Sequence, residues 1–330
     1  MLRTVHVDQT ALVLNGPNGL KVAAKRYTPR DTSNGAGLTL LLAHCIGSCK
    51  EQWEIMLERL FALQQPKAPH LRIREAISVD RQNHGDAALL NFEALKARPQ
   101  GVSIVDWTSA IADFVKLELR GHRIVPIGQS AGAAALLNTT EYFPSSALPY
   151  IALFLVEPTI IWEAMYNETR EDRETMMDFI MRGTLARRES WPTRDDAFAS
   201  LRKRLPWAMW DPRAVKLFTE HGLYDDGARV VLKCDRKQEA ISYPDVKPQF
   251  HGMTQLYRVC EALPVHVIWG DRSDIVPDYV QRSLDGAAAS VSVVEDAGHF
   301  VVQEKPDALA DAIANVLDRI PDTGSSRSRL

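Results

Sequence analysis

The segment that most constrains the fold of this chain is the pentapeptide Gly-Gln-Ser-Ala-Gly at residues 128–132. It follows the apolar run 124–127, which is typical of a buried strand, and precedes alanines and leucines that are typical of a helix start. A serine on a sharp strand-to-helix turn needs neighbours without bulky side chains, and Gly128 and Gly132 meet that need. The pattern therefore predicts a nucleophilic Ser130 beside the positive end of a helix dipole, as in an esterase-like enzyme.

A nucleophilic serine requires a general base, and residues 291–300 supply one near the end of the chain. The apolar run 291–294 predicts a strand, and His299 follows it in a loop. From such a loop an imidazole can reach across the carboxyl edge of a parallel sheet, take the serine proton and return it to the leaving group. The order of serine before histidine fits an open α/β sheet. We therefore expect His299 to serve Ser130.

Two carboxylates are candidates for the acid that orients this histidine. Glu157 ends the apolar run 151–156, and Asp274 lies shortly after the run 265–269, which is the commoner location for such an acid. Either carboxylate could bond to the far nitrogen of His299, fix its tautomer and stabilise the imidazolium. The residue pattern alone does not choose between them.

An oxyanion formed at the serine needs two backbone N–H donors. We expect the first from Ala131 and the second from the loop after the apolar run 38–43, which reads His-Cys-Ile-Gly at residues 44–47. The amide of Ile46 is the predicted second donor. Cys45 stands where glycine is usual, which predicts a less permissive backbone in this loop.

Metal and cofactor chemistry are not expected. His44, Cys45 and Cys49 are metal-ligand types, but no second Cys/His pair stands at ligand spacing elsewhere in the chain. With Cys234 and Cys260, the cysteines are predicted to be reduced thiols of an intracellular enzyme.

Composition excludes several other classes of protein. The chain has 330 residues, of which 45% are hydrophobic and 25% charged, as in an ordinary globular protein. A net charge of -3 gives no field that would attract nucleic acid. No apolar stretch is long enough to predict a transmembrane segment.

Short apolar runs alternate with helical patterns, which predicts an α/β fold with a mostly parallel central sheet flanked by helices. The expected strands are 19–24, 38–43, 76–79, 124–127, 151–156, 265–269 and 291–294, and the clearest helices are 107–117 and 306–317. A Pro-Gly-Asn cluster at 15–19 predicts a hairpin turn. The strand rhythm stops after residue 158. We therefore expect a core formed by 1–158 and 264–320, with a helical cap or lid inserted at 159–263.

The predicted cap carries aromatic, methionine and basic side chains. The aromatic and methionine residues could line an acyl pocket or simply pack the cap, and the basic ones could bind coenzyme A phosphates or form a solvated face. They are Trp162, Trp191, Trp207, Trp210, Met176, Met177, Arg182, Arg187, Arg188 and Lys203.

The last residues, 321–330, predict a flexible tail, since they are polar and contain helix breakers. The terminal tripeptide Ser328, Arg329 and Leu330 is a conservative form of the Ser-Lys-Leu address. It predicts binding to the peroxisomal import receptor and location in the peroxisome, and otherwise in the cytoplasm.

The segment 43–54 is similar to the His-Gly-x-Gly-x-x-Lys-Glu-x-aromatic-Glu signature of a fungal peroxisomal group within the α/β-hydrolase superfamily. That group includes a yeast peroxisomal lipase, hydrolases of toxin clusters and the acyl-CoA hydrolase of mycophenolic acid biosynthesis. In the mycophenolic acid enzyme the acid follows the strand after the nucleophile, in a Leu-Asp-Pro-Leu segment that is similar to Val-Glu-Pro-Thr at 156–159 here. The resemblance therefore favours Glu157 as the acid and keeps Asp274 as the alternative. Cys45 replaces a glycine of the group, and Gln129 replaces a histidine.

The resemblance implies a serine hydrolase that cleaves a small-molecule acyl-CoA thioester through an acyl-enzyme, in fungal secondary, toxin or lipid metabolism. A lipase or carboxylesterase acting on free esters is the alternative. A catalytically idle binding protein is a further alternative, which the altered oxyanion loop motivates. Epoxide hydrolysis and dehalogenation are disfavoured, because they place Asp where this chain has Ser130.

Overall fold

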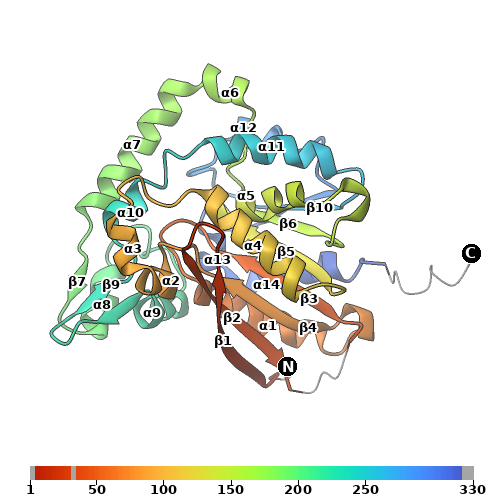
Figure 1. Ribbon diagram of the computed structural model, residues 1–330, viewed down its shortest axis with the longest axis horizontal. Coiled ribbons are helices and arrows are strands. Elements are labelled where there is room, and N and C mark those ends of the chain that lie inside the picture. Colours follow the sequence, from red (N-terminus) through yellow and green to blue (C-terminus); the bar gives the residue numbers. More distant parts are fainter. Residues whose placement is uncertain (1–3, 31–34, 322–330) are drawn as a thin grey trace, which may run out of the picture.

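Eight strands form one sheet in the order β1-β2-β4-β3-β5-β6-β10-β11 (Figure 1). The computed structural model describes residues 4–30 and 35–321. The strands β1 and β2 form an antiparallel hairpin, β2 pairs antiparallel with β4, and all the later pairings are parallel. The strands are β1 (Val7–Asn15), β2 (Lys21–Pro29), β3 (Leu38–Ala43), β4 (Ile73–Val79), β5 (Arg123–Gln129), β6 (Leu153–Val156), β10 (Val265–Gly270) and β11 (Ser290–Val294). The predicted α/β fold class is confirmed.

Helices cover both faces of the sheet, because alternate strand residues point to opposite sides. On β3, Leu41 joins the core cluster that also contains residues of α4, α5 and α11, whereas Leu40 and Leu42 join the cluster with α1 and α14. The helices of the core are α1 (Glu54–Gln64), α2 (Gly85–Leu90), α3 (Phe92–Lys96), α4 (Ile104–Glu118), α5 (Ala131–Asn138), α12 (Asp278–Arg282), α13 (Val301–Glu304) and α14 (Pro306–Leu317). The predicted helices at 107–117 and 306–317 are confirmed as α4 and α14.

The first strand was not predicted from the sequence. Most of β1 is exposed at the edge of the sheet, so its sequence lacks the apolar run that marks a buried strand. The hairpin turn that joins β1 to β2 is confirmed, with the Gly16 amide donating to the Leu20 carbonyl oxygen at 2.8 Å.

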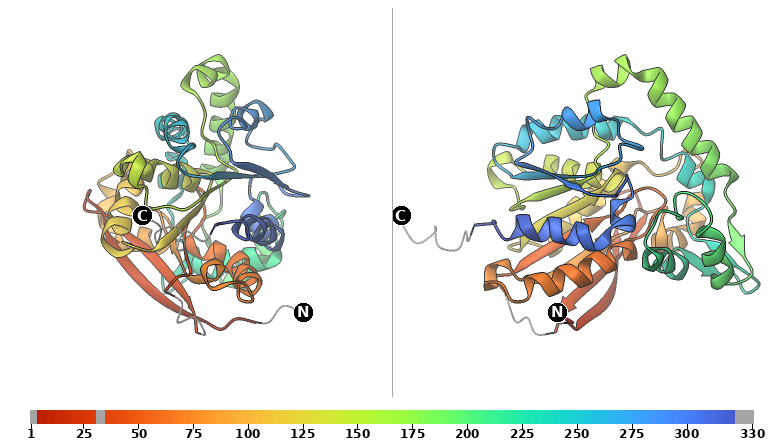
Figure 2. Two further views of the ribbon diagram at one scale, coloured as in Figure 1. Left: turned by 90° about the vertical axis from the view of Figure 1, so that its right-hand side faces the viewer. Right: turned by 180° about the vertical axis from the view of Figure 1, so that it is seen from behind.

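The segment between β6 and β10 contains strands as well as helices. A small antiparallel sheet in the order β7-β9-β8 lies at the far end of the long helix α7 (Figures 1 and 2). The segment consists of α6 (Glu163–Glu168), α7 (Arg170–Ala186), β7 (Ser190–Trp191), α8 (Arg194–Leu201), α9 (Pro212–His221), β8 (Leu223–Asp225), β9 (Val230–Leu232), α10 (Arg236–Ala240) and α11 (Lys247–Val259). These strands are two or three residues long, too short to leave a periodic signal in the sequence.

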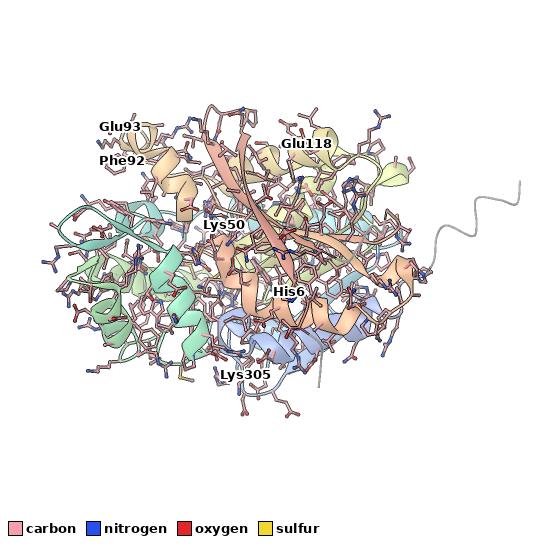
Figure 3. All side chains as sticks on the ribbon, turned by 90° about the horizontal axis from the view of Figure 1, so that it is seen from below. His6, Lys50, Phe92, Glu93, Glu118 and Lys305 are labelled. Atoms are coloured by element: carbon pink, nitrogen blue, oxygen red, sulfur yellow. The ribbon has the colours of Figure 1, made fainter. Side chains whose placement is uncertain are left out.

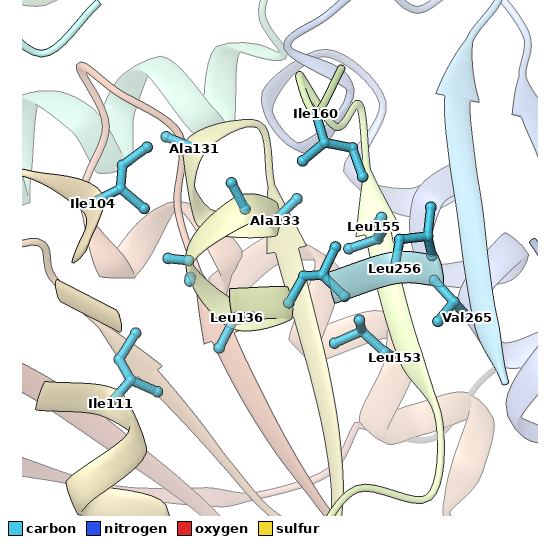
Figure 4. Close-up of a cluster of buried hydrophobic side chains, with 14 of the residues drawn as sticks. Ile104, Ile111, Ala131, Ala133, Leu136, Leu153, Leu155, Ile160, Leu256 and Val265 are labelled. Carbon is cyan, nitrogen blue, oxygen red and sulfur yellow. The ribbon is translucent and has the colours of Figure 1, made fainter. Parts of the chain in front are cut away.

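The helix α11 belongs to the core layer, although it falls within the segment predicted as a cap. Its buried residues Met253, Leu256 and Val259 pack in the same cluster as α5 and β6, and Figure 4 shows side chains of these three elements meeting. A helix with an apolar stripe of this kind is stabilised by covering a sheet face. The structural boundary of the insertion therefore falls before α11 rather than at residue 263.

Two close backbone approaches explain the glycines around Ser130. A Cβ on Gly128 would lie 2.4 Å from the Gly132 carbonyl oxygen, and a Cβ on Gly132 would lie 2.2 Å from the Ala43 carbonyl oxygen. The second contact joins the first turn of α5 to the end of β3. The serine turn and the loop after β3 are therefore held together by backbone contact.

Replacing Gly132 with alanine is expected to destabilise the protein by about 3 kcal/mol, since a methyl group cannot fit without moving α5 away from β3. Urea denaturation measures the change. Gly183→Ala on α7 is the matched control, because a Cβ there meets nothing within 4 Å. It should be neutral or stabilise by roughly 0.5–1 kcal/mol. Equal losses in both variants would contradict this account of the turn.

Candidate active site

Ser130 lies in a strained turn between β5 and α5. Its backbone has φ 54° and ψ -116°, a conformation that residues with a Cβ rarely adopt. Its amide donates to the Val156 carbonyl oxygen at 3.0 Å, which ties the turn to the end of β6. The Ser130 side chain is thereby held at the carboxyl edge of the sheet, next to the N-terminus of α5.

Glu157 and His299 meet across this edge. The imidazole Nδ1 of His299 lies 3.1 Å from Glu157 Oε2, and both side chains are buried. The other oxygen, Oε1, accepts a hydrogen bond of 2.6 Å from the Gly270 amide. Glu157 itself has a positive φ of 49°, and its amide donates to Ile268 of β10. The carboxylate is therefore fixed from two sides, and it can accept a hydrogen bond from the Nδ1–H of His299.

Asp274 contacts the backbone of the histidine rather than its ring. Its Oδ1 accepts a hydrogen bond of 2.9 Å from the His299 amide. The structure thus brings both candidate carboxylates to His299, but only Glu157 reaches the imidazole. Asp274 instead holds the loop that carries the histidine.

Gln129 also holds the histidine loop. The Gln129 side chain is fully buried, and its Nε2 donates to the His299 carbonyl oxygen at 3.0 Å and to Gln303 Oε1 at 3.1 Å. Gln303 in turn donates to Ser48 Oγ at 3.4 Å. This pair of amides links the serine turn, the histidine loop and the loop after β3, which is a clear structural role for the residue before Ser130.

Two neutral histidines shape the loop after β3. Burial lowers the pKa of His44 to about 4 and the pKa of His84 well below its ordinary value, so both rings are uncharged at neutral pH. His44 Nδ1 donates to the Cys45 carbonyl oxygen at 2.7 Å, and His84 Nε2 accepts from the Gly47 amide at 3.0 Å. The contact of His84 with this loop was not foreseen from the sequence.

The predicted oxyanion donors lie beside Ser130. Ile46 and Ala131 line the same cavity as Ser130 and His299, and within the described residues neither of their amides has a hydrogen-bond acceptor. Cys45 does not have a positive φ, so its backbone needs no glycine. The left-handed position in this loop is taken by Gly47 with φ 77°, so the replacement of glycine by Cys45 introduces no backbone strain at residue 45. Burial also raises the pKa of the Cys45 thiol to about 12, so it stays protonated.

A buried lysine forms ion pairs next to this loop. Lys50 is 3% exposed, and its Nζ lies 2.8 Å from Glu51, 3.1 Å from Asp80 and 2.6 Å from Asp86. Burial by itself lowers the pKa of Lys50, but Asp80 and Glu51 outweigh that effect and raise it. Figure 3 shows Lys50 toward the middle of the view, with Lys305 at the edge. The Lys-Glu pair of the signature is thus buried and takes part in an ion-pair network next to this loop.

The cavity at Ser130 has a volume of about 70 Å³. Its walls come from the loops after β3, β6 and β10, the serine turn, α7, the segment 243–249 and the histidine loop: Cys45, Ile46, Ser130, Ala131, Thr159, Arg173, Met177, Ile180, Tyr243, Gln249, Ile275, His299 and Phe300. Of the residues that the sequence suggested for an acyl pocket, Met177 lies here. Sequence reasoning missed Arg173 and Tyr243, because neither belongs to a recognisable motif.

Other residues suggested from the sequence pack the insertion. Trp191, Trp207 and Trp210 are buried together in a separate hydrophobic cluster. Arg187 is not a free cation for a phosphate, because both terminal nitrogens of its guanidinium bind Glu239. In the part of the chain that the structure describes, no group of three potential metal ligands is found. No helix in those residues is long and apolar enough to cross a membrane.

The sheet topology and the geometry at Ser130, Glu157 and His299 together indicate the class of protein to which the chain belongs. The chain belongs to the alpha/beta hydrolase family, whose model matches residues 40–312. It is similar to the abhydrolase domain-containing protein AFT2-1 of Alternaria alternata, with 27% identity over 175 residues, which is 41% of this chain and 64% of that relative. The alignment therefore spans less than two thirds of the relative's length.

Two solved structures share the fold. The peroxisomal alpha-beta-hydrolase Lpx1 from Saccharomyces cerevisiae matches with a TM-score of 0.73 and 19% identity, covering 96% of this chain and 89% of that one. E-2-(acetamidomethylene)succinate hydrolase matches with a TM-score of 0.70 and 18% identity, covering 94% of this chain and 100% of that one.

Replacing Lys50 with methionine is expected to destabilise the protein by about 3 kcal/mol, because Asp80 is left buried without its counter-ion. The free energy of unfolding in urea measures this. Adding Asp80→Asn to the same variant should recover part of the loss. Lys305→Met is the control, since Lys305 is 40% exposed and 3.7 Å from Asp296, and should cost about 1 kcal/mol or less. A Lys50→Met loss no larger than the control would contradict the stabilising role of Lys50.

Proposed function

We propose that this protein is a serine hydrolase that cleaves acyl thioesters of the acyl-CoA type. The observation that carries the proposal is the His299–Glu157 hydrogen bond of 3.1 Å beside a cavity that Ser130 also lines. In this proposal Ser130 is the nucleophile, His299 the general base and Glu157 the acid that orients the histidine, which are the three groups that acyl transfer needs. It requires no cofactor.

In the proposed reaction, Ser130 Oγ attacks the acyl carbonyl while His299 Nε2 takes its proton. Glu157 stabilises the imidazolium, and the Ile46 and Ala131 amides bind the oxyanion of the tetrahedral intermediate. Collapse of the intermediate expels the thiolate, which receives the proton from His299 and leaves an acyl-serine. Water, activated by His299, then attacks the acyl-serine and releases the carboxylic acid and the free Ser130 hydroxyl.

The cavities near Ser130 limit the size of the acyl group and of the leaving group. A cavity of about 70 Å³ accepts only a short acyl group. A larger groove of about 470 Å³ lies between α6, α7 and α11, and Met177 lines both spaces. This supports a substrate whose acyl group enters the cavity while a long leaving group, such as the pantetheine arm of coenzyme A, occupies the groove. The small cavity also favours a second candidate, a carboxylesterase for short-chain esters.

A panel of acyl-CoA thioesters and matching plain esters tests the reaction. Ser130→Ala should lower kcat by roughly 10⁴-fold or more, and Glu157→Gln by about 10³–10⁴-fold, since the histidine loses its anionic partner. Asp274→Asn should lower kcat less than about tenfold, because the amide oxygen still accepts from the His299 N–H.

Loss of activity with Asp274→Asn but not Glu157→Gln would contradict the choice of acid. Turnover of esters without thioesters would favour the carboxylesterase. A fluorophosphonate probe distinguishes both enzymes from an idle binding protein, because only an activated Ser130 is labelled in the folded chain.

We further propose that the protein is imported into peroxisomes through Ser328, Arg329 and Leu330, which lie outside the described residues. The fold that it shares with a yeast peroxisomal hydrolase supports this location. A fluorescent protein fused ahead of residue 1 should appear in peroxisomes, and removal of the last three residues should leave it in the cytosol. Unchanged peroxisomal fluorescence after the removal would contradict the proposal.

A further inference from the structure

Arg173 is a buried cation that the proposed reaction does not use. It lies on α7, it is 6% exposed, and its Nε is buried without a hydrogen-bond partner. Within residues 4–30 and 35–321, its guanidinium makes no hydrogen bond or ion pair. Arg187 lies just beyond the end of the same helix and is also buried, but its guanidinium is paired with the Glu239 carboxylate, as is usual for a buried arginine.

An unpaired buried guanidinium is costly. Arginine does not give up its proton in proteins, so it cannot escape the desolvation penalty by becoming neutral. That penalty amounts to several kcal/mol unless an anion compensates it. The planar fork of N–H donors matches a carboxylate with two parallel hydrogen bonds. The missing partner of Arg173 is therefore expected to be an anion that comes with a ligand.

The position of Arg173 specifies where that anion must be. Arg173 lines the same cavity as Ser130 and His299, and among the described residues of this cavity there is no carboxylate. The other residues of α7 that line this cavity are the apolar Met177 and Ile180. Since Arg173, Ser130 and His299 line the same small cavity of about 70 Å³, we expect an anion bound by Arg173 to lie close to the carbonyl under attack. The phosphates of coenzyme A do not meet this condition, since the whole pantetheine arm separates them from the thioester.

We propose that the substrate carries a carboxylate close to the scissile carbonyl, and that Arg173 binds it. The substrate class is then the half-thioester or half-ester of a short dicarboxylic acid. This inference rests on the proposed function, in which Ser130 is the nucleophile. Arg173 determines specificity, because a carboxylate anchored on α7 fixes the acyl chain and presents its carbonyl to Ser130.

A matched pair of acyl groups tests the inference. Glutaryl and 5-methylhexanoyl chains have nearly the same shape, but the first ends in a carboxylate and the second in an isopropyl group. Each is offered as an N-acetylcysteamine thioester, which has no phosphate, as a methyl ester and as a coenzyme A thioester. The variants are Arg173→Gln, Arg173→Lys and the control Arg182→Gln, whose arginine is on the same helix and 80% exposed.

The wild-type protein should prefer the glutaryl thioester by roughly 100-fold in kcat/KM, which is the effect of a buried charged hydrogen-bonded pair. Arg173→Gln should remove most of this preference, so that the kcat/KM values of the glutaryl and 5-methylhexanoyl thioesters become similar. Arg173→Lys should keep part of the preference, and Arg182→Gln should keep all of it. Glutarate should raise the Tm of the wild-type protein and of Ser130→Ala, but not of Arg173→Gln.

Other results would overturn the inference. One is equal loss of both acyl thioesters in Arg173→Gln together with a lower Tm, which would make Arg173 a packing residue. Another is an Arg173→Gln defect confined to the coenzyme A thioesters, which would assign the arginine to a phosphate. Ser130-dependent turnover without any preference for glutaryl would overturn this inference and leave the proposed function intact. No turnover, but an Arg173-dependent Tm shift with glutarate, would support the carboxylate site and refute the proposed function.

Discussion

The close approach of α5 to the end of β3 is the constraint on which the rest of the site depends. The Cα of Gly132 lies so near the Ala43 carbonyl oxygen that no side chain fits between them. This contact places the first turn of α5 beside the loop that carries Ile46. Ser130 is held in a strained backbone conformation at the same point, and the strain is offset by the packing of α5 against β3, α4 and α11. Ser130, the candidate nucleophile, and the candidate oxyanion donors therefore share one rigid junction.

Several buried polar groups extend this junction to the rest of the site. Gln129 and Gln303 connect the serine turn to the histidine loop, and Lys50 and two neutral histidines hold the loop after β3. Each of these groups is expensive to bury alone, and each is satisfied by partners from a different element. Arg173 departs from this rule in the described part of the chain. It does so inside the cavity, where a ligand would supply the missing partner.

The insertion between β6 and α11 forms part of the wall of the cavity at Ser130. Its helix α7 runs along the outside of the molecule (Figure 2) and contributes Arg173, Met177 and Ile180 to the cavity wall. In the proposed reaction, the core supplies the groups that act on the acyl carbonyl, and α7 supplies groups that would contact the acyl chain. Selectivity is therefore expected to change with α7 while the reaction type does not.

Local patterns in the sequence determined the fold class and most of the parallel sheet. Buried strands have continuous apolar sequences, and the serine turn requires small neighbouring residues. The exposed strand β1 and the short strands of the insertion leave no such signal. The sequence also identified Ser130, His299 and two carboxylates as candidate catalytic residues. The distances between them, however, depend on loops that lie far apart in the chain. Only the tertiary structure decided that Glu157 faces the imidazole and Asp274 the backbone. Burial likewise exists only in the folded chain, so the structure alone distinguished the paired Arg187 from the unpaired Arg173.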